Sequence, residues 1–393
     1  MKYDVVVIGA GIQGAGVAQA AVAAGYSVLM LEERAVAAGT SSKSSKLIHG
    51  GLRYLESGQF GLVWESLHER ALLLKLAPEL VKLQQLHIPI YKDSKRSPLT
   101  IRAGLSLYAL LAGLNKNALF RSLPKMLWGD LDELKQENLR AVFRYCEAQT
   151  DDAALTRAVL HSAQTLGAEL KIPARFIGAR RDTCCCKVTY EALGRQEIVS
   201  CRVLVNCAGP WGRNVLARVL PAMALPDVDL VQGSHLLLPP LLKHYFYLEA
   251  PQDKRAVFAL PWQGKLLVGT TERLHTDAPE TAACTEAEQE YLLTTLLHYF
   301  PHLHIAKSHI ESFAGLRVLP RSNKNAFARP REVLFAVDNA AQPRVLSVMG
   351  GKLTTYRATA QMVLSRLQSS LPKKYGRANT ERLQLNPVDK IIC

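Results

Sequence analysis

The first 32 residues constrain the fold most strongly. Residues 4–8, Asp-Val-Val-Val-Ile, are the short β-branched apolar run of a buried parallel strand, and Gly9-Ala10-Gly11-Ile12-Gln13-Gly14 follows at once. A small-residue helix over 15–24 and a strand over 27–31 come next, and Glu32 closes that strand. Such glycines allow close approach to a pyrophosphate, the helix N-terminus supplies free N–H groups, and the acid bonds ribose hydroxyls. We predict a dinucleotide site in which NAD or FAD fits better than NADP.

Composition indicates an enzyme with a large core. The 393 residues are 48% hydrophobic, which is enough for two or three domains. No cationic segment with an apolar run and cleavage site precedes the first strand, so we expect cytoplasmic synthesis. The eight cysteines lack CxxC or framework spacing, which predicts reduced thiols. We interpret Cys184, Cys185 and Cys186 as part of a strand, where alternate side chains face opposite ways, and predict no metal site.

A net charge of +14 and a pI near 9.4 favour an anionic partner, and nucleic acid, a lipid surface and a phosphorylated substrate compete for that role. The cations are dispersed and no nucleic-acid module is visible, so we expect no nucleic acid. An apolar stretch from Ala103 to Leu114, too short to span a bilayer, is flanked by basic residues. It fits either a basic amphipathic segment on anionic lipid or a buried helix with a solvated basic rim. The basic residues are Lys92, Lys95, Arg96, Arg102, Lys116, Arg121 and Lys125.

Three later segments favour a flavin. Residues 41–56 crowd hydroxyls, three cations, a histidine and a Gly-Gly pair after the nucleotide unit. A strand over 198–206 runs into Cys207-Ala208-Gly209-Pro210-Trp211, a turn typical of the return to an FAD domain. A strand over 345–348 leads into Met349-Gly350-Gly351-Lys352 and a helix over about 355–369. A helix N-terminus there stabilises the negative charge of a reduced flavin, whereas a nicotinamide needs no such turn.

These motifs together resemble the D-amino-acid-oxidase-like flavoprotein superfamily and, within it, the FAD-dependent glycerol-3-phosphate dehydrogenases. The resemblance covers residues 1 to about 375. It implies noncovalent FAD, oxidation of sn-glycerol 3-phosphate to dihydroxyacetone phosphate by hydride transfer from C2 to flavin N5, and a quinone as second acceptor. It also implies a peripheral site on the inner face of the cytoplasmic membrane. The family's C-terminal helical domain is expected to be absent, and the oligomeric state is not indicated. The motifs are Thr40 to Glu56, Asp151-Asp152-Ala153, Ala208 to Trp211, Gly233-Ser234-His235, Gly269-Thr270-Thr271, Gly315-Leu316-Arg317 and Gly350 to Arg357 with Ala360.

The predicted cofactor contacts come from the glycine turn, the acid after the second strand, the serine-rich loop and the two later turns. We assign the loop's first half to FAD phosphate and ribitol, and its second half to the flavin ring and substrate. The contacts are Gly9, Gly11, Gly14, Glu32, Ser41, Ser42, Ser45, Lys46, Gly50, Gly209, Trp211, Gly350, Gly351, Lys352, Leu353 and Thr354.

The implied oxidation needs cations that clamp the phosphate and stabilise the developing carbonyl. The resemblance places three arginines near the substrate. The planar guanidinium meets two phosphate oxygens at once, so we predict Arg53 and Arg329 as phosphate ligands. Arg317 is predicted to polarise the C2 oxygen.

The oxidation also needs a base. His235 is the preferred base, because an imidazole titrates near the working pH. Lys352 and His49 compete for that role. Thr270 is predicted to donate a hydroxyl bond to substrate, and Tyr54 to wall the pocket.

We predict two interleaved domains in an α/β chain. A Rossmann-type FAD-binding domain takes residues 1–84, 146–226 and 338–393, and an α+β substrate domain with a mixed or antiparallel sheet takes 85–145 and 227–337. Helices are expected from an Asp or Thr cap at 150–152 to about 167, and over 285–298 behind a Thr-Glu-Ala-Glu cap. Two other functions stay open: an oxidase of the same superfamily acting on an amino acid or 2-hydroxy acid, and a non-catalytic flavin- or lipid-binding relic.

Overall fold

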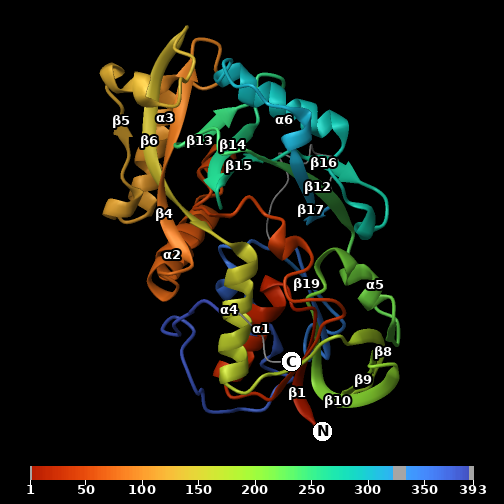
Figure 1. Cartoon of the computed structure of the whole chain (residues 1–393). Helices are drawn as coiled ribbons and strands as arrows, with labels where there is room; N and C mark the ends of the chain where they lie inside the picture. The colour runs from red at the N-terminus through yellow and green to blue at the C-terminus, as the bar shows by residue number, and fades with distance from the viewer. Residues whose placement is uncertain (1, 322–332, 389–393) are drawn as a thin grey trace.

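The computed structural model describes residues 2–321 and 333–388, which form two lobes, each built on one mixed sheet (Figure 1). The first sheet contains β1 (Tyr3–Ile8), β2 (Val28–Leu31), β7 (Glu169–Lys171), β8 (Arg175–Arg181), β9 (Cys186–Ala192), β10 (Arg195–Asn206), β11 (Val219–Leu220), β18 (Leu334–Val337) and β19 (Val345–Met349). The second contains β3 (Leu47–Ile48), β4 (Val81–Tyr91), β5 (Arg121–Ser122), β6 (Leu139–Thr150), β12 (Val228–Leu238), β13 (Tyr245–Glu249), β14 (Ala256–Trp262), β15 (Lys265–Gly269), β16 (Arg273–His275) and β17 (Glu311–Pro320). The helices are α1 (Ile12–Ala23), α2 (Phe60–Leu76), α3 (Pro98–Leu111), α4 (Asp152–Thr165), α5 (Gly212–Leu216), α6 (Glu286–Tyr299) and α7 (Tyr356–Leu367).

The first sheet has a parallel centre in the order β7-β2-β1-β10-β19, with antiparallel additions at β18 and at β8 and β9. Every residue of β1 is buried, as its unbroken apolar run predicts for a strand covered on both faces. The chain leaves β1 through the glycine turn and enters α1. This strand–turn–helix unit confirms the predicted Rossmann-type start and places the turn at the carboxyl edge of the sheet, where such folds bind ligands.

Helices α1, α4 and α7 pack together on one face of this sheet, below the second lobe in Figure 1. The small residues of α1 are almost all buried, so the helix lies close to its neighbours. The predicted cap of α4 is confirmed: the Asp151 carboxylate accepts a hydrogen bond from the Ala154 amide at 2.8 Å. These caps fix where each helix begins and therefore where the loops around the cavity start.

The second sheet is mixed, because β13 runs parallel to β4 while its other pairings are antiparallel. Helix α6 packs over β12, β14 and β15 at the top of Figure 1, whereas α2 and α3 cover β4 and β6. The capping box predicted for α6 is confirmed, with Thr285 and Glu288 bonding each other's backbone amide. Strand β12 pairs along its length with β17 and carries His235 toward the first lobe.

The chain changes sheet between β11 and β12, at the predicted boundary of 226 and 227, but not at the other predicted domain boundaries. Strands β4 and β6 form one long antiparallel pair that starts at Val81 opposite Thr150, so both continue past residues 85 and 145. The short strand β3, inside the first predicted segment, also pairs in the second sheet, and β18 pairs in the first sheet although it precedes residue 338. Each lobe therefore takes in a few residues from the neighbouring predicted segment.

The three consecutive cysteines do not lie in one strand. Strand β9 begins at Cys186, and Cys184 and Cys185 belong to the turn before it, where both amides donate to the Asp182 carboxylate at 2.8 Å. The strand interpretation is therefore wrong for those two residues. In the described part of the chain, Asp182, Cys184 and Cys185 form the group of side chains close enough to hold a metal ion, with ligand atoms within 4.8 Å of one another.

Candidate active site

A cavity of about 580 Å³ runs between the two lobes. One end is lined by the turn from Gly9 to Gln13 and by Glu32, and the other by His235 and Phe258. The volume is within the range of small-molecule and cofactor sites. Both predicted halves, nucleotide site and substrate site, therefore open into the same space.

The nucleotide end is shaped by backbone turns. Gly9 has a φ of +96°, and an added Cβ there would lie 2.8 Å from the Cys207 carbonyl oxygen. The Glu32 carboxylate accepts hydrogen bonds from the Ala10 and Arg34 amides at 2.8 and 2.9 Å, which hold it beside the turn. Ser41 accepts from the Ile12 amide at 2.9 Å, so its hydroxyl lies at the N-terminus of α1. This arrangement suits a pyrophosphate flanked by ribose.

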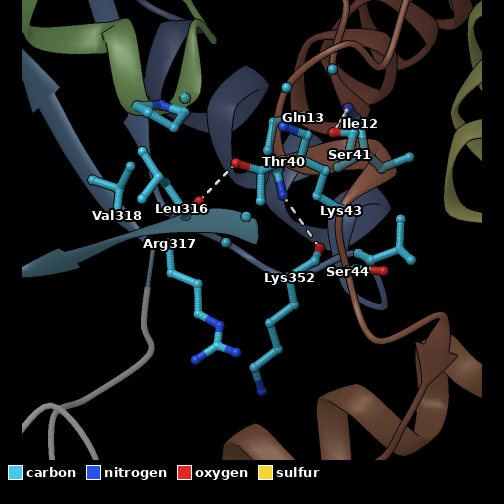
Figure 2. Close-up of a pocket in the computed structure, with 18 of the residues that line it drawn as sticks. Ile12, Gln13, Thr40, Ser41, Lys43, Ser44, Leu316, Arg317, Val318 and Lys352 are labelled. Carbon is cyan, nitrogen blue, oxygen red and sulfur yellow. Dashed lines mark hydrogen bonds between the residues drawn. The ribbon is translucent and has the colours of Figure 1, made fainter. Parts of the chain in front are cut away.

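The first and last glycine turns meet at Gln13. Its side-chain amide donates to the Lys352 carbonyl at 3.3 Å, and a Cβ on Gly351 would lie 2.6 Å from that same nitrogen (Figure 2). Gly350 and Gly351 both have positive φ, of 81° and 95°, which favours glycine. The Gln13 Oε1 atom is buried in the cavity wall without a partner in the described structure. A ribityl or ribose hydroxyl would satisfy it, so the wall fits FAD.

His235 lies in the opposite wall, 2% exposed. Its Nε2 is hydrogen-bonded to the Ser45 hydroxyl at 2.8 Å, and its ring stacks on Phe313 with centroids 4.9 Å apart. Burial, together with the charges of Arg317 and Lys46, lowers the pKa of His235 from 6.5 to about 3. The resting imidazole is therefore neutral at neutral pH, and the expectation that it titrates near the working pH is not met in this structure. Its Nδ1 has no hydrogen-bond partner within residues 2–321 and 333–388.

Arg317 is anchored on strand β17 beside His235. Its guanidinium donates to the Glu272 carboxylate at 3.2 Å and to the Thr270 hydroxyl at 3.3 Å. A Cβ on Gly233 would lie 2.8 Å from the Arg317 Nη2 atom, so glycine at that position leaves room for the side chain. Figure 2 shows the Arg317 and Lys352 side chains extending side by side in the same direction. Cation and hydroxyl donors thus converge near the neutral imidazole.

Lys352 and the second half of the serine-rich loop line the same part of the cavity. The Lys352 ammonium lies 4.0 Å from the centre of the Tyr54 ring and 3.3 Å from the Ser66 hydroxyl. His49 and Arg53 also line the cavity. The prediction that the second half of this loop faces the flavin ring and substrate requires this position. Arg329 lies outside the described residues, so its predicted phosphate contact has no structural account.

Four predicted cofactor contacts do not line the cavity in the described structure: Gly14, Ser42, Lys46 and Gly50. The Lys46 ammonium instead donates to Asp152 at 2.7 Å in a buried ion pair. Gly50 is required by packing, since an added Cβ would lie 2.2 Å from the Tyr108 hydroxyl. Lys46 and Gly50 thus contribute to the packing of the loop and do not line the cavity. The remaining predicted cofactor contacts all line the cavity.

Three residues that the sequence reasoning passed over also shape the site. Glu272 orients Arg317, although it directly follows the quoted Gly-Thr-Thr motif. Asp152 holds both Ser44 and Lys46. Its position in the Asp151-Asp152-Ala153 motif is the sequence signal that could have identified it as a site residue. Lys43 lines the cavity, where the sequence reasoning assigned Lys46.

We expect Gly14→Ala to lower both the thermal midpoint and the flavin content. An added Cβ would lie 1.9 Å from the Gly9 carbonyl oxygen. Because that oxygen belongs to the backbone, only movement of the glycine turn can relieve the overlap. Overpacking of this kind costs about 1–3 kcal/mol. The measurements are thermal unfolding and the ratio of flavin to protein absorbance.

Gly104→Ala, inside α3, is the matched control, because no described atom lies within 4 Å of the added Cβ. It should stabilise the protein by about 0.5–1 kcal/mol through helix propensity. Equal flavin content in both variants would contradict the role given to Gly14.

Comparison with known proteins gives one family match and several relatives. Residues 4–357 match the family described as DAO, FAD dependent oxidoreductase. A glycerol-3-phosphate dehydrogenase from Pseudomonas aeruginosa is 37% identical over 372 residues, covering 93% of this chain and 72% of that protein. A D-erythritol 1-phosphate dehydrogenase from Brucella abortus is 34% identical over 95% of this chain and 75% of its own length. The crystal structure of glycerol-3-phosphate dehydrogenase from Bacillus halodurans complexed with FAD is similar with a TM-score of 0.74 and 25% identity, covering 98% of this chain and 68% of that one.

Proposed function

The chain belongs to the DAO family of FAD-dependent oxidoreductases, and from that membership we propose that it oxidises sn-glycerol 3-phosphate to dihydroxyacetone phosphate. The observation that carries the proposal is the grouping of Arg317, Lys352 and Arg53 with the neutral His235 imidazole in one cavity. A phosphomonoester needs cations, and its adjacent alcohol needs a proton acceptor. Both are present where the two glycine turns leave room for a flavin.

FAD, when bound, supplies the hydride acceptor. His235 accepts the proton of the C2 hydroxyl on a ring nitrogen that is neutral and buried. Arg317 and Thr270 donate hydrogen bonds to the C2 oxygen as its carbonyl develops, in the manner of an oxyanion hole. Arg53 binds the phosphate, and Lys352 adds positive charge beside it. Together these side chains fix the substrate carbon and exclude water from it.

A larger polyol phosphate is the second candidate substrate. The similarity to the Brucella abortus D-erythritol 1-phosphate dehydrogenase, at 34% identity, favours it. Glycerol 3-phosphate and erythritol 1-phosphate share a phosphomonoester and a secondary alcohol, so the same cations and base serve both. The two differ in length, and the wall near Phe258 and Tyr247 is where a longer chain would be accommodated.

An anaerobic reduction experiment tests the proposal. The flavin absorbance of the holoenzyme is followed after addition of glycerol 3-phosphate, erythritol 1-phosphate, glycerol, lactate or an amino acid. Bleaching by glycerol 3-phosphate but not glycerol supports the proposal, and faster bleaching by the erythritol ester supports the second substrate. Bleaching by lactate or an amino acid alone would overturn both. Reoxidation of the bleached enzyme by a soluble quinone faster than by air supports the proposed quinone acceptor.

The outer face of α3 supports attachment to an anionic membrane. Leu105, Tyr108 and Ala109 face the core, so the helix is half-buried, while Leu99 and Leu110 are 75% and 61% exposed. Of the basic residues named for this segment, Arg96 is mostly buried in ion pairs with Glu56 and Glu249. The other six are exposed and can contact lipid phosphates while the leucines enter the interface. Within residues 2–321 and 333–388, no helix has the length and apolar character needed to cross a bilayer. We therefore propose peripheral attachment on the inner face of the cytoplasmic membrane.

We expect the protein to float with vesicles of anionic lipid at low salt and to be released as salt rises. Ions screen the attraction between exposed cations and lipid phosphates within a Debye length of about 8 Å at physiological ionic strength. Leu110→Ser should weaken flotation further at every salt concentration, because it removes exposed apolar area. Equal flotation with neutral and anionic vesicles would contradict an electrostatic contribution.

A further inference from the structure

The Glu288 carboxylate is a buried hub that lies outside the cavity. It belongs to the first turn of α6 and accepts hydrogen bonds from the Thr285 amide and hydroxyl at 3.1 and 3.0 Å, as a capping box requires. Three further donors reach it from the second sheet: the hydroxyls of Ser234 and Thr271 at 2.8 and 2.6 Å, and the Gln232 amide at 2.7 Å. Helix capping alone needs none of these three.

Each donor to Glu288 in the described structure is a neutral group. Burial raises the pKa of the Glu288 carboxyl, but the hydrogen bonds from Thr271, Thr285 and Ser234 outweigh burial and bring it below its ordinary value. The carboxylate is therefore ionised. A buried charge held by neutral donors keeps those donors in one arrangement, because each move leaves it less solvated.

Two of the donors, Ser234 and Thr271, are chain neighbours of residues of the proposed site. Ser234 precedes His235 on β12, and Thr271 follows Thr270 after β15. Pairing between β12 and β15 ends at His235 opposite Gly269. Beyond that point the two segments are joined by a backbone hydrogen bond from the Thr271 amide to the Ser234 carbonyl at 3.3 Å. The Ser234 amide also donates to the Thr271 hydroxyl at 2.9 Å, and Glu288 accepts from both hydroxyls. Glu288 thus reinforces, through side chains, the segment between the β12–β15 pairing and the β12–β16 pairing, which resumes at Gln232 opposite Arg273.

Contacts from Gly269 and Ser45 link the position of the Gly269–Thr271 segment to that of the His235 imidazole. A Cβ on Gly269 would lie 2.2 Å from the His235 ring, so the ring rests directly on that backbone. The His235 ring also stacks on Phe313, and its Nε2 is hydrogen-bonded to the Ser45 hydroxyl. Movement of the Gly269–Thr271 segment therefore moves both the floor of the His235 ring and the Thr270 hydroxyl that bonds Arg317.

We propose that Glu288 is a positioning residue, which sets the His235 imidazole and the Thr270 hydroxyl for substrate oxidation without touching the substrate. This inference rests on the proposed function for its kinetic consequence. Misplacement of a reacting group by about 1 Å costs up to ~10²-fold in rate. An amide in place of the carboxylate removes the negative charge and one of the two acceptor oxygens. The Ser234 and Thr271 hydroxyls, which both bond Oε1, must then reverse to accept from the amide or lose their bonds to residue 288.

The test compares Glu288→Gln with Glu286→Gln, an exposed acid in the same helical turn, in the FAD-loaded enzyme. Glu288→Gln should lower the limiting rate of flavin reduction ~10–100-fold, with flavin content unchanged and the substrate dissociation constant within about threefold. Ser234→Ala, which keeps the capping box, should give a smaller loss and covers the case in which Glu288→Gln folds poorly. A lower thermal midpoint with a wild-type rate, or an equal rate loss in Glu286→Gln, would overturn the proposal.

An imidazole ¹H–¹⁵N correlation spectrum separates this inference from the proposed function. The His235 signal, assigned by its loss in His235→Asn, should shift in Glu288→Gln and Ser234→Ala but not in Glu286→Gln. That readout needs no substrate. If no polyol phosphate reduces the wild-type flavin, the proposed function fails, whereas an unmoved His235 signal in Glu288→Gln refutes the positioning role itself.

Discussion

His235→Asn should slow reduction of the bound flavin by glycerol 3-phosphate by ~10²–10⁴-fold, the usual contribution of a positioned base, while FAD stays bound. The amide keeps a hydrogen bond to Ser45 and similar bulk, but it cannot accept the hydroxyl proton. The glycine turns that hold the cofactor are on the opposite wall and are unaffected. Stopped-flow absorbance under anaerobic, single-turnover conditions measures the rate.

Two controls define this result. His302→Asn, an exposed histidine of the second lobe, should leave the rate unchanged. The wild-type rate should show no inflection from His235 between about pH 5 and 9, because burial, Arg317 and Lys46 lower the pKa of His235 to about 3. A rate for His235→Asn within twofold of wild type would assign the base to Lys352 or His49 instead.

The same shift affects stability. The folded-state pKa of His235 lies below the unfolded value of 6.5, so the unfolded chain binds more protons in acid. The native state therefore loses stability as the pH falls from about 6.5 toward 3, and none of this loss occurs above 6.5. His235→Asn removes this contribution. Between pH 6.5 and 3 its free energy of unfolding should therefore fall less, from its own value at neutral pH, than that of the wild type.

Arg317→Ala should lower the limiting rate of flavin reduction by ~10²–10³-fold, which is the usual effect of removing one donor to a developing oxyanion. Folding should tolerate the change, because Glu272 keeps an ion pair with Arg255 at 3.6 Å. Arg317→Lys should recover only part of the rate, since an ammonium cannot reproduce the planar fork that meets both Glu272 and Thr270.

Added guanidinium gives an independent check, because a small cation that enters the space left in Arg317→Ala should restore part of the rate. Arg273→Ala, an exposed arginine of β16, is the control for lost positive charge. If Arg317→Ala raises the substrate dissociation constant and leaves the limiting rate unchanged, Arg317 binds the phosphate and not the C2 oxygen.

Local patterns predicted the fold well. The apolar run of β1, its glycine turn and the caps at Asp151 and Thr285 act within a few residues, so the sequence alone fixes where those elements begin. The sheet to which each strand belongs was less predictable. Strands β4 and β6 pair over sequence separations that no local window covers. This pairing carries both strands across the predicted domain boundaries at residues 85 and 145.

The site was predictable in composition but not in orientation. Lys43 and Lys46 are equivalent cations in one loop, yet Lys43 lines the cavity while Lys46 pairs with Asp152, 106 positions away. The neutrality of His235 depends on burial and on charges from two other segments. Such features arise only when distant elements pack, so residue type suggested the chemistry whereas tertiary contacts decide which atom is available.

The hydrogen bond from Gln13 to Lys352 spans 339 positions and has a consequence for biosynthesis. Strand β1 has its partner β2 early in translation, but β10 and β19 are made much later. Long-range pairing of this kind delays folding. The wall of the cofactor cavity closes only after residue 352 has left the ribosome, so we expect FAD to be captured late and to stabilise the two assembled lobes rather than a nascent one.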